Sequence, residues 1–165
     1  MAAERVTLRP ARPADAAAVA DIWRRGWADG HLGNVPDALV AVRTDESFDT
    51  RAAQRVGDTV VATVGDAVAG FVMVTGDEVE QVYVATGHRG TGVAGTLLAE
   101  AERLVAANGH GRAWLAVAVG NDRARRFYEK CGWVDDGVFD YPATAPPDPP
   151  VTVRCHRYTR SVTPR

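Results

Sequence analysis

The chain has 165 residues, 46% of them hydrophobic, and carries 19 Lys and Arg against 21 Asp and Glu, a net charge of −2. This length and composition predict a single domain over residues 1–165 with a core of its own, and they exclude wholesale disorder. The balanced charge lacks the basic excess of nucleic-acid-binding proteins, and the two cysteines have no zinc-site spacing, so we expect neither nucleic acid nor metal as a partner.

The first sixty residues predict one strand and two helical regions. A short strand over residues 6–9 ends at prolines, and Asp15 then stands where it can cap a helix. The apolar residues of this helix recur at helical spacing and comprise Val19, Ile22, Trp23 and Trp27. Residues 30–36 predict a loop. A second helical region follows, with Thr44 or Ser47 as its cap.

The middle of the chain predicts three strands joined by short connections. They cover residues 59–64, 67–75 and 78–85, and a Gly-Asp pair marks each of the two turns. Such short connections indicate an antiparallel meander, because a parallel pair needs a crossover of a dozen or more residues.

A strand–helix–strand unit follows the meander. The third strand leads through a glycine-rich loop into an amphipathic helix, and a nearly all-apolar strand over residues 113–119 comes next. The apolar face of the helix is formed by Leu97, Leu98, Ala101, Leu104 and Val105. This order predicts that the strands on either side of the helix are parallel neighbours with a right-handed crossover.

The C-terminal third predicts one helix and two strands. The helix covers residues 122–131 and stops at Gly132, and the strands cover residues 137–141 and 151–158. The segment between these strands, residues 143–150, contains four prolines. We therefore expect it to be a surface loop.

The glycine-rich loop has the sequence Gly-Thr-Gly-Val-Ala-Gly over residues 90–95 and opens a helix. Free backbone N–H groups and the helix dipole attract anions at such a terminus, so three glycines preceded by Arg89 predict a phosphate site. The loop also satisfies the G-x-G-x-x-G dinucleotide fingerprint, which is weak alone. Its position behind an antiparallel meander disfavours a doubly wound dinucleotide fold, so a nucleotide-dependent oxidoreductase is the less favoured alternative.

Two segments resemble the signatures of the GNAT-type N-acetyltransferase superfamily. Residues 89–94 match its Arg/Gln-x-x-Gly-x-Gly/Ala loop. Asn121 and the run over residues 124–133 are similar to its second signature, Asn-x-x-Ala-x-x-Phe-Tyr-Glu-Lys-x-Gly-Phe, in the expected order and spacing. The resemblance implies an α/β fold with a mixed, largely antiparallel central sheet, a parallel splayed strand pair and helices on both faces.

The resemblance further implies acetyl-coenzyme A as the co-substrate. In this family the loop grips the pyrophosphate, and the pantetheine arm runs between the splayed strands. The residues implied to bind the coenzyme are Val82, Tyr83, Val84, Arg89, Gly90, Thr91, Gly92, Val93, Ala94, Gly95, Thr96 and Asn121. Asn121 can also cap the helix that follows it.

Acetyl transfer to an amine requires a polarised thioester carbonyl, a neutral amine and a proton for the departing thiolate. Tyr128 matches the family tyrosine that faces the coenzyme sulfur, which implies a general acid, and a core aromatic is the competing interpretation. Glu80 is our candidate base, because it precedes Val82 and Val84 by two and four residues and should share their strand face. Glu78 on the same face, or water, is the alternative.

Trp27 and His31 are candidates for the acceptor pocket, since they flank the end of the first predicted helix. The acceptor itself stays open among small metabolites, antibiotic amines, polyamines, protein N-termini and lysines. Because no cysteine is placed naturally for a covalent relay, we expect direct transfer in a ternary complex. A catalytically silent sensor of acyl-coenzyme A is the main alternative.

The sequence shows no apolar run typical of a signal peptide or a membrane span. We therefore expect a cytoplasmic protein without a membrane partner. A homodimer is compatible with the resemblance, and the sequence itself does not set the oligomeric state.

Overall fold

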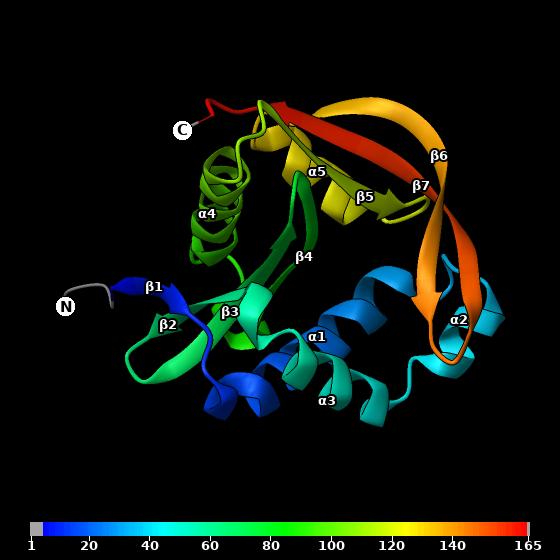
Figure 1. Cartoon of the computed structure of the whole chain (residues 1–165), viewed down its shortest axis with the longest axis horizontal. Helices are drawn as coiled ribbons and strands as arrows, with labels where there is room; N and C mark the ends of the chain where they lie inside the picture. Colours follow the sequence, from blue (N-terminus) through cyan, green and yellow to red (C-terminus); the bar gives the residue numbers. More distant parts are fainter. Residues whose placement is uncertain (1–4, 165) are drawn as a thin grey trace.

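The computed structural model describes residues 5–164, which form one seven-stranded sheet with the order β1-β2-β3-β4-β5-β7-β6 (Figure 1). The strands are β1 (Val6–Pro10), β2 (Thr59–Val64), β3 (Ala67–Thr75), β4 (Glu78–Val84), β5 (Arg112–Ala118), β6 (Val134–Ala145) and β7 (Asp148–Ser161). Neighbouring strands are antiparallel except for β4 and β5, which are parallel. The predicted meander, the strand–helix–strand unit and the mixed sheet are confirmed.

Helices cover both faces of the sheet, as the resemblance implies (Figure 1). One face carries α1 (Ala16–His31), α2 (Asp37–Val42) and α3 (Asp45–Gln54), whose apolar residues share a core with the sheet. The other face carries α4 (Val93–Ala107) and α5 (Asp122–Lys130), over a second core. None of the helices in residues 5–164 has both the length and the hydropathy needed to cross a membrane.

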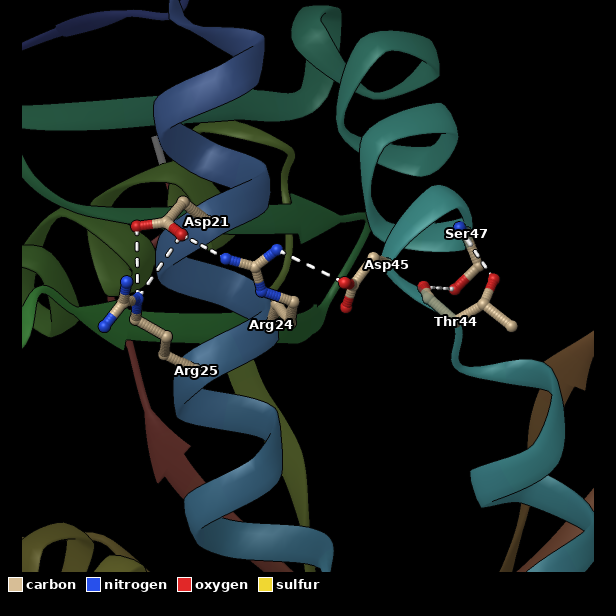
Figure 2. A network of polar contacts seen from close by, with 6 residues as sticks. All are labelled: Asp21, Arg24, Arg25, Thr44, Asp45 and Ser47. Atoms are coloured by element: carbon tan, nitrogen blue, oxygen red, sulfur yellow. Dashed lines mark hydrogen bonds and ion pairs between the residues drawn. The ribbon is translucent and has the colours of Figure 1, made fainter.

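Packing and polar contacts hold α3 beside α1. The ring of Trp23 on α1 is fully buried and lies edge-on against Phe48 of α3, with 5.8 Å between the ring centroids. Thr44 begins α3 by accepting a hydrogen bond at Oγ1 from the Ser47 N–H at 3.1 Å, which settles the two predicted caps in favour of Thr44 (Figure 2). Arg24 adds an exposed link from Asp21 to Asp45, which contributes little energy by itself (Figure 2).

The parallel strands β4 and β5 part almost as soon as they meet. Their ladder has a single register pair, Glu78 with Trp114. Trp114 is fixed there by its backbone N–H and its indole N–H, which donate to the backbone and side chain of Asp77 at 3.1 and 3.0 Å. Beyond this point β4 stays paired with β3 and β5 with β7, so the two halves of the sheet diverge (Figure 1).

The C-terminal prolines lie in a long hairpin, so the expected surface loop over residues 143–150 is wrong. β6 and β7 pair as far as Ala145 and Asp148, and only Pro146 and Pro147 lie between the strands. The sheet tolerates the prolines because β6 is an edge strand and because the part of β7 before Cys155 extends beyond β5. A missing N–H group therefore costs few ladder bonds there.

Asp15 precedes α1 but does not cap it through its side chain. Its carboxylate accepts hydrogen bonds from the Arg9 guanidinium at 2.7 and 3.0 Å and from the Arg12 N–H at 2.8 Å. The hydrogen bonds from Arg9 are the main reason that the pKa of Asp15 falls to about 2. Asp15 thus joins β1 to the short turn η1 (Pro13–Asp15) and does not act as the predicted helix cap.

We expect the Asp15→Asn variant to lose about 1–2 kcal/mol of unfolding free energy at neutral pH. The folded-state pKa is lowered, so the stabilisation is present above the unfolded pKa of about 4 and disappears as the pH falls towards 2. The loss is smaller than the lowering of the pKa alone would give, because the Arg9 side chain is 27% exposed and water screens the ion pair. Urea unfolding at neutral pH and in acid measures this difference.

The control is Asp49→Asn, which removes an exposed carboxylate from α3. Its unfolding free energy should follow that of the wild type at both pH values. A loss in Asp15→Asn that is equally large in acid would show that the ion pair is not its cause.

Candidate active site

A cavity of about 440 Å³ opens where β4 and β5 diverge, and helices α1, α2 and α3 together with the β6–β7 hairpin complete its walls. It gathers site residues that the sequence predicted separately. Those that line it are Trp27, His31, Glu78, Glu80, Val82, Tyr83, Asn121 and Tyr128. Val84, the last residue of β4, and the glycine-rich loop that follows the strand lie outside its lining.

Two tyrosines meet in this cavity from opposite sides. Tyr128 comes from α5, where its ring packs against Phe127 and Tyr158 with centroid distances of 5.3 and 6.0 Å. Burial raises the pKa of Tyr128 well above its usual value, and Cys131 adds to the shift. Burial likewise raises the pKa of Tyr83 on β4, with Tyr128 as a further cause. Both phenols are therefore protonated at neutral pH and available as donors.

The two carboxylates of β4 do not share a face with Val82 and Val84, contrary to the sequence-based expectation. The register with β3 pairs Val74 with Val79 but Met73 with Gln81, so Glu80 is an extra residue at a bulge. Val82 packs into the core beneath α4, whereas Glu80 faces Arg55 near the end of α3. The bulge breaks the alternation on which the expectation rested.

Each carboxylate has its own partner in the cavity. Glu80 forms an ion pair with Arg55 at 2.7 Å. Glu78 accepts a hydrogen bond from the Tyr141 hydroxyl at 2.6 Å. Burial raises the pKa of Glu78, an effect that the Tyr141 hydrogen bond opposes and the charge of Glu80 reinforces. The site therefore holds one ion-paired carboxylate and one with increased proton affinity.

Trp27 and His31 form a stacked pair at the C-terminal end of α1. Their rings lie 5.0 Å apart and nearly parallel, and the His31 Nδ1 lies 3.1 Å from the Trp27 carbonyl oxygen. Burial lowers the pKa of His31 to about 4, and the charge of Arg43 adds to this effect. His31 is thus neutral at physiological pH and offers the cavity a flat, uncharged wall.

The sequence analysis missed the three arginines of the cavity, Arg43, Arg51 and Arg55. Arg43 directly follows α2, while Arg51 and Arg55 are four residues apart at the end of α3. That spacing places Arg51 and Arg55 on one helix face, and this pattern was visible in the sequence. Nothing in the sequence indicated that this face turns towards β4.

A glycine on α1 makes room for one wall of the cavity. A Cβ atom built on Gly26 would lie 2.2 Å from the Tyr83 ring, so no larger residue fits without moving that ring. A Cβ on Gly30, one turn later, would lie 2.7 Å from the amide nitrogen of Asn121. Asn121 accepts a hydrogen bond from the Ala124 N–H at 3.3 Å, which confirms it as the cap of α5.

The glycine-rich loop leaves open space around the N-terminus of α4. Gly90 and Gly92 have φ angles of +77° and +86°, which only glycine adopts readily, and Gly92 is the residue before the first helical turn. A Cβ atom on Gly90, Gly92 or Gly95 would meet no atom within 4 Å. Arg89 pairs with Asp29 of α1 at 2.5 Å. The N–H groups of the first turn therefore face space that a phosphate could occupy.

Comparison with known proteins agrees with this geometry. The family model for the acetyltransferase (GNAT) family matches residues 18–133, so the chain belongs to this family. The resemblance seen in the two sequence signatures is thereby confirmed. No curated protein matches the sequence significantly.

Solved structures show the same fold. A GCN5-related N-acetyltransferase from Rhodopseudomonas palustris aligns with a TM-score of 0.73 at 24% identity, covering 98% of this chain and 99% of that chain. PaiA N-acetyltransferase from Thermoplasma acidophilum, in complex with coenzyme A, aligns with a TM-score of 0.69 at 15% identity, covering 95% of this chain and 99% of that chain. YncA from Salmonella typhimurium, with its cofactor acetyl-CoA, aligns with a TM-score of 0.68 at 17% identity, covering 98% of this chain and 96% of that chain.

We expect Gly26→Ala to lower the free energy of unfolding by about 1–2 kcal/mol, although alanine is the better helix former. The new methyl group would collide with the Tyr83 ring and force the wall of the cavity to move. Thermal or urea unfolding measures the change.

Gly95→Ala is the matched control, because Gly95 also lies within a helix but has open space around it. It should leave stability unchanged or raise it by up to about 1 kcal/mol. Equal effects of the two substitutions would argue against a packing constraint at Gly26.

Proposed function

We propose that this chain, as one acetyltransferase domain over residues 1–165, transfers an acetyl group from acetyl-coenzyme A directly to a primary amine. The observation that carries the proposal is the cavity between β4 and β5, which combines a protonated phenol with two carboxylates next to the strand that leads into the glycine-rich loop. Membership of the acetyltransferase family and the coenzyme-bound structures of PaiA and YncA support it.

The chain offers a coherent set of contacts for the coenzyme. The backbone N–H groups of residues 90–96 would hold the pyrophosphate, and Arg89 would exchange Asp29 for a phosphate oxygen. The edge of β4 over residues 82–84 has no ladder partner on the β5 side, so its polar groups are free to bind the pantetheine arm and the thioester oxygen. Asn121 would add a hydrogen bond to the arm while it caps α5.

In the proposed reaction the amine nitrogen forms a bond to the acetyl carbon while the carbon–sulfur bond breaks. Glu80 accepts the amine proton, directly or through water, and Arg55 fixes the position of its carboxylate. The Tyr128 hydroxyl donates its proton to the departing sulfur. Glu78, whose pKa is raised by burial, is the alternative base.

The protonation state of the cysteine thiol in the cavity disfavours a covalent acetyl relay. Cys155 lines the cavity, but burial raises its pKa to about 11. The thiol is therefore protonated at neutral pH and is a weak nucleophile. Cys131 follows the last turn of α5 and does not line the cavity. Direct attack by the amine needs neither group.

Calorimetry with coenzyme A and a thiol-release assay with acetyl-coenzyme A and an amine library test the proposal together. Coenzyme binding with acetylated product supports it. Coenzyme binding without thiol release across a broad library would favour a silent acyl-coenzyme A sensor, and no binding would reject both. The single parallel strand pair already separates this fold from the doubly wound sheet of dinucleotide enzymes.

We expect Tyr128→Phe to lower kcat about 100-fold or more, because the departing thiolate loses its proton donor. The Kd for coenzyme A should change by less than about threefold, since the ring stays in place. Stopped-time thiol release and calorimetry measure the two quantities.

Tyr158→Phe is the matched control. It removes the hydroxyl of the neighbouring buried ring, which donates to Glu129 at 2.7 Å outside the cavity. It should lower stability and leave kcat unchanged. A Tyr128→Phe enzyme with wild-type kcat would remove this phenol from the mechanism.

Substitutions of the two carboxylates should separate their roles. We expect Glu80→Gln to lower kcat/KM at least about tenfold and, after correction for protonation of the amine itself, to abolish the remaining fall in rate on the acid side, because a base works only when ionised. Glu78→Gln should retain that acid limb. The measurement is the pH dependence of kcat/KM for both variants. The reverse pattern would assign the base to Glu78, and an acid limb retained in both would assign it to water.

A further inference from the structure

Two half-buried arginines point to the chemical class of the acceptor. Arg43 and Arg51 line the cavity, and the Nε of Arg43 and the Nη1 of Arg51 are buried without a hydrogen-bond partner. In the described part of the chain neither guanidinium pairs with a carboxylate. A buried cation without a counter-charge is costly, so these two positions need an explanation.

The carboxylates of the cavity offset this pair only in part: burial and the charge of Arg43 lower the pKa of Arg51 by more than the charge of Glu80 raises it. Glu80 is engaged by Arg55, and Glu78 is engaged by the Tyr141 hydroxyl. His31 adjoins Arg43 and is neutral, since its pKa is about 4. The lining therefore has three guanidinium groups against two carboxylates, which leaves an excess of positive charge at the end formed by α2 and α3.

Aromatic rings hold Arg51 in place for binding. The Arg51 guanidinium carbon lies 4.2 Å from the centroid of the Trp23 ring and 5.8 Å from that of Phe48. Burial, followed by the charge of Arg43, lowers the pKa of Arg51 to about 10, so it remains charged at neutral pH. Two guanidinium groups that line one cavity, repel each other and have no carboxylate partner among residues 5–164 form a receptor for an oxyanion.

We propose that the acceptor is a small amine that also carries an oxyanion, either a carboxylate or a phosphate, and that Arg43 and Arg51 bind this group while the amine faces Glu80. The inference rests on the proposed acetyl transfer and narrows its substrate class. Polyamines and polycationic antibiotics lack a counterpart for the arginines and are repelled by them. A lysine side chain or a protein N-terminus lacks the oxyanion as well.

The test compares amines in matched pairs that differ only in the anion. The pairs are 4-aminobutyrate with butylamine, α-amino acids with their amides, and phosphoethanolamine with ethanolamine, with spermidine as the polycation. We expect kcat/KM to favour the anionic member about 10- to 100-fold, the discrimination that charged hydrogen bonds provide. The carboxylate pairs and the phosphate pair show which oxyanion fits.

Arginine variants then assign the preference to the site. Arg43→Gln and Arg51→Gln should each reduce the ratio between anionic and neutral members at least about tenfold, mainly through KM. Arg51→Lys keeps the charge and should retain part of the ratio. Arg103→Gln is the control, because it removes an arginine of α4 that pairs with Glu100 away from the cavity; its ratio should equal that of the wild type.

A ligand-binding experiment tests the same site if no amine of the panel reacts. With coenzyme A saturating the glycine-rich loop, acetate or inorganic phosphate should raise the unfolding temperature of the wild type and of Arg103→Gln. The rise should disappear in Arg43→Gln and Arg51→Gln. Equal rates within every pair, or a rise that survives in both cavity variants, would overturn the oxyanion site and leave acetyl transfer intact. Failure to bind coenzyme A would overturn both.

Discussion

The parting of β4 from β5 is the constraint on which the rest of the molecule depends. A sheet normally satisfies every interior backbone group through its ladder, and here the ladder stops after Glu78 and Trp114. The strands cannot close again, because β4 is fixed by β3 and β5 is fixed by seven register pairs with β7. The polar edge that remains is compatible with a folded state only if a ligand or solvent meets it.

The two walls that follow from this split are shaped by different forces. On one side, Gly26 and Gly30 let α1 approach so closely that Tyr83 and Asn121 become its direct neighbours. On the other side, the β6–β7 hairpin reaches past the end of β5 and brings Tyr141 to Glu78. The cavity is thus a consequence of close helix packing against one half of the sheet and of strand length in the other.

The sequence predicted those features that depend on neighbours along the chain. The glycine-rich loop, the cap at Asn121 and the order of strands all follow from local pattern, and the structure agrees. The bulge at Glu80 was not predictable, because it reflects how β3 and β4 pair rather than the composition of either strand. The extended hairpin was missed because prolines disfavour strands only where their N–H groups would be needed.

The cavity arginines were missed for another reason. Arg43 directly follows α2, and Arg51 lies on α3, whose position beside α1 depends on the packing of Trp23 against Phe48, a contact between residues 25 positions apart. Local pattern assigns charged residues at a helix end to the solvent, and only the tertiary arrangement shows that these two line a cavity. The acetyl donor was therefore predictable from sequence, whereas the proposed class of acceptor rests on long-range packing.

In the proposed acetyl transfer, charge connects the acceptor pocket with catalysis. An amine arrives mostly protonated at neutral pH and must lose a proton before it can attack the thioester. Positive charge nearby disfavours the ammonium form, so Arg43 and Arg51 lower the pKa of a bound amine as well as repel it. An oxyanion on the same molecule would offset the repulsion on binding, and with it part of the effect on the pKa of the amine, so the proposed base Glu80, which pairs with Arg55, has to take the remaining proton. The proposed division of roles is therefore that the arginines select the acceptor and the carboxylate generates its reactive form.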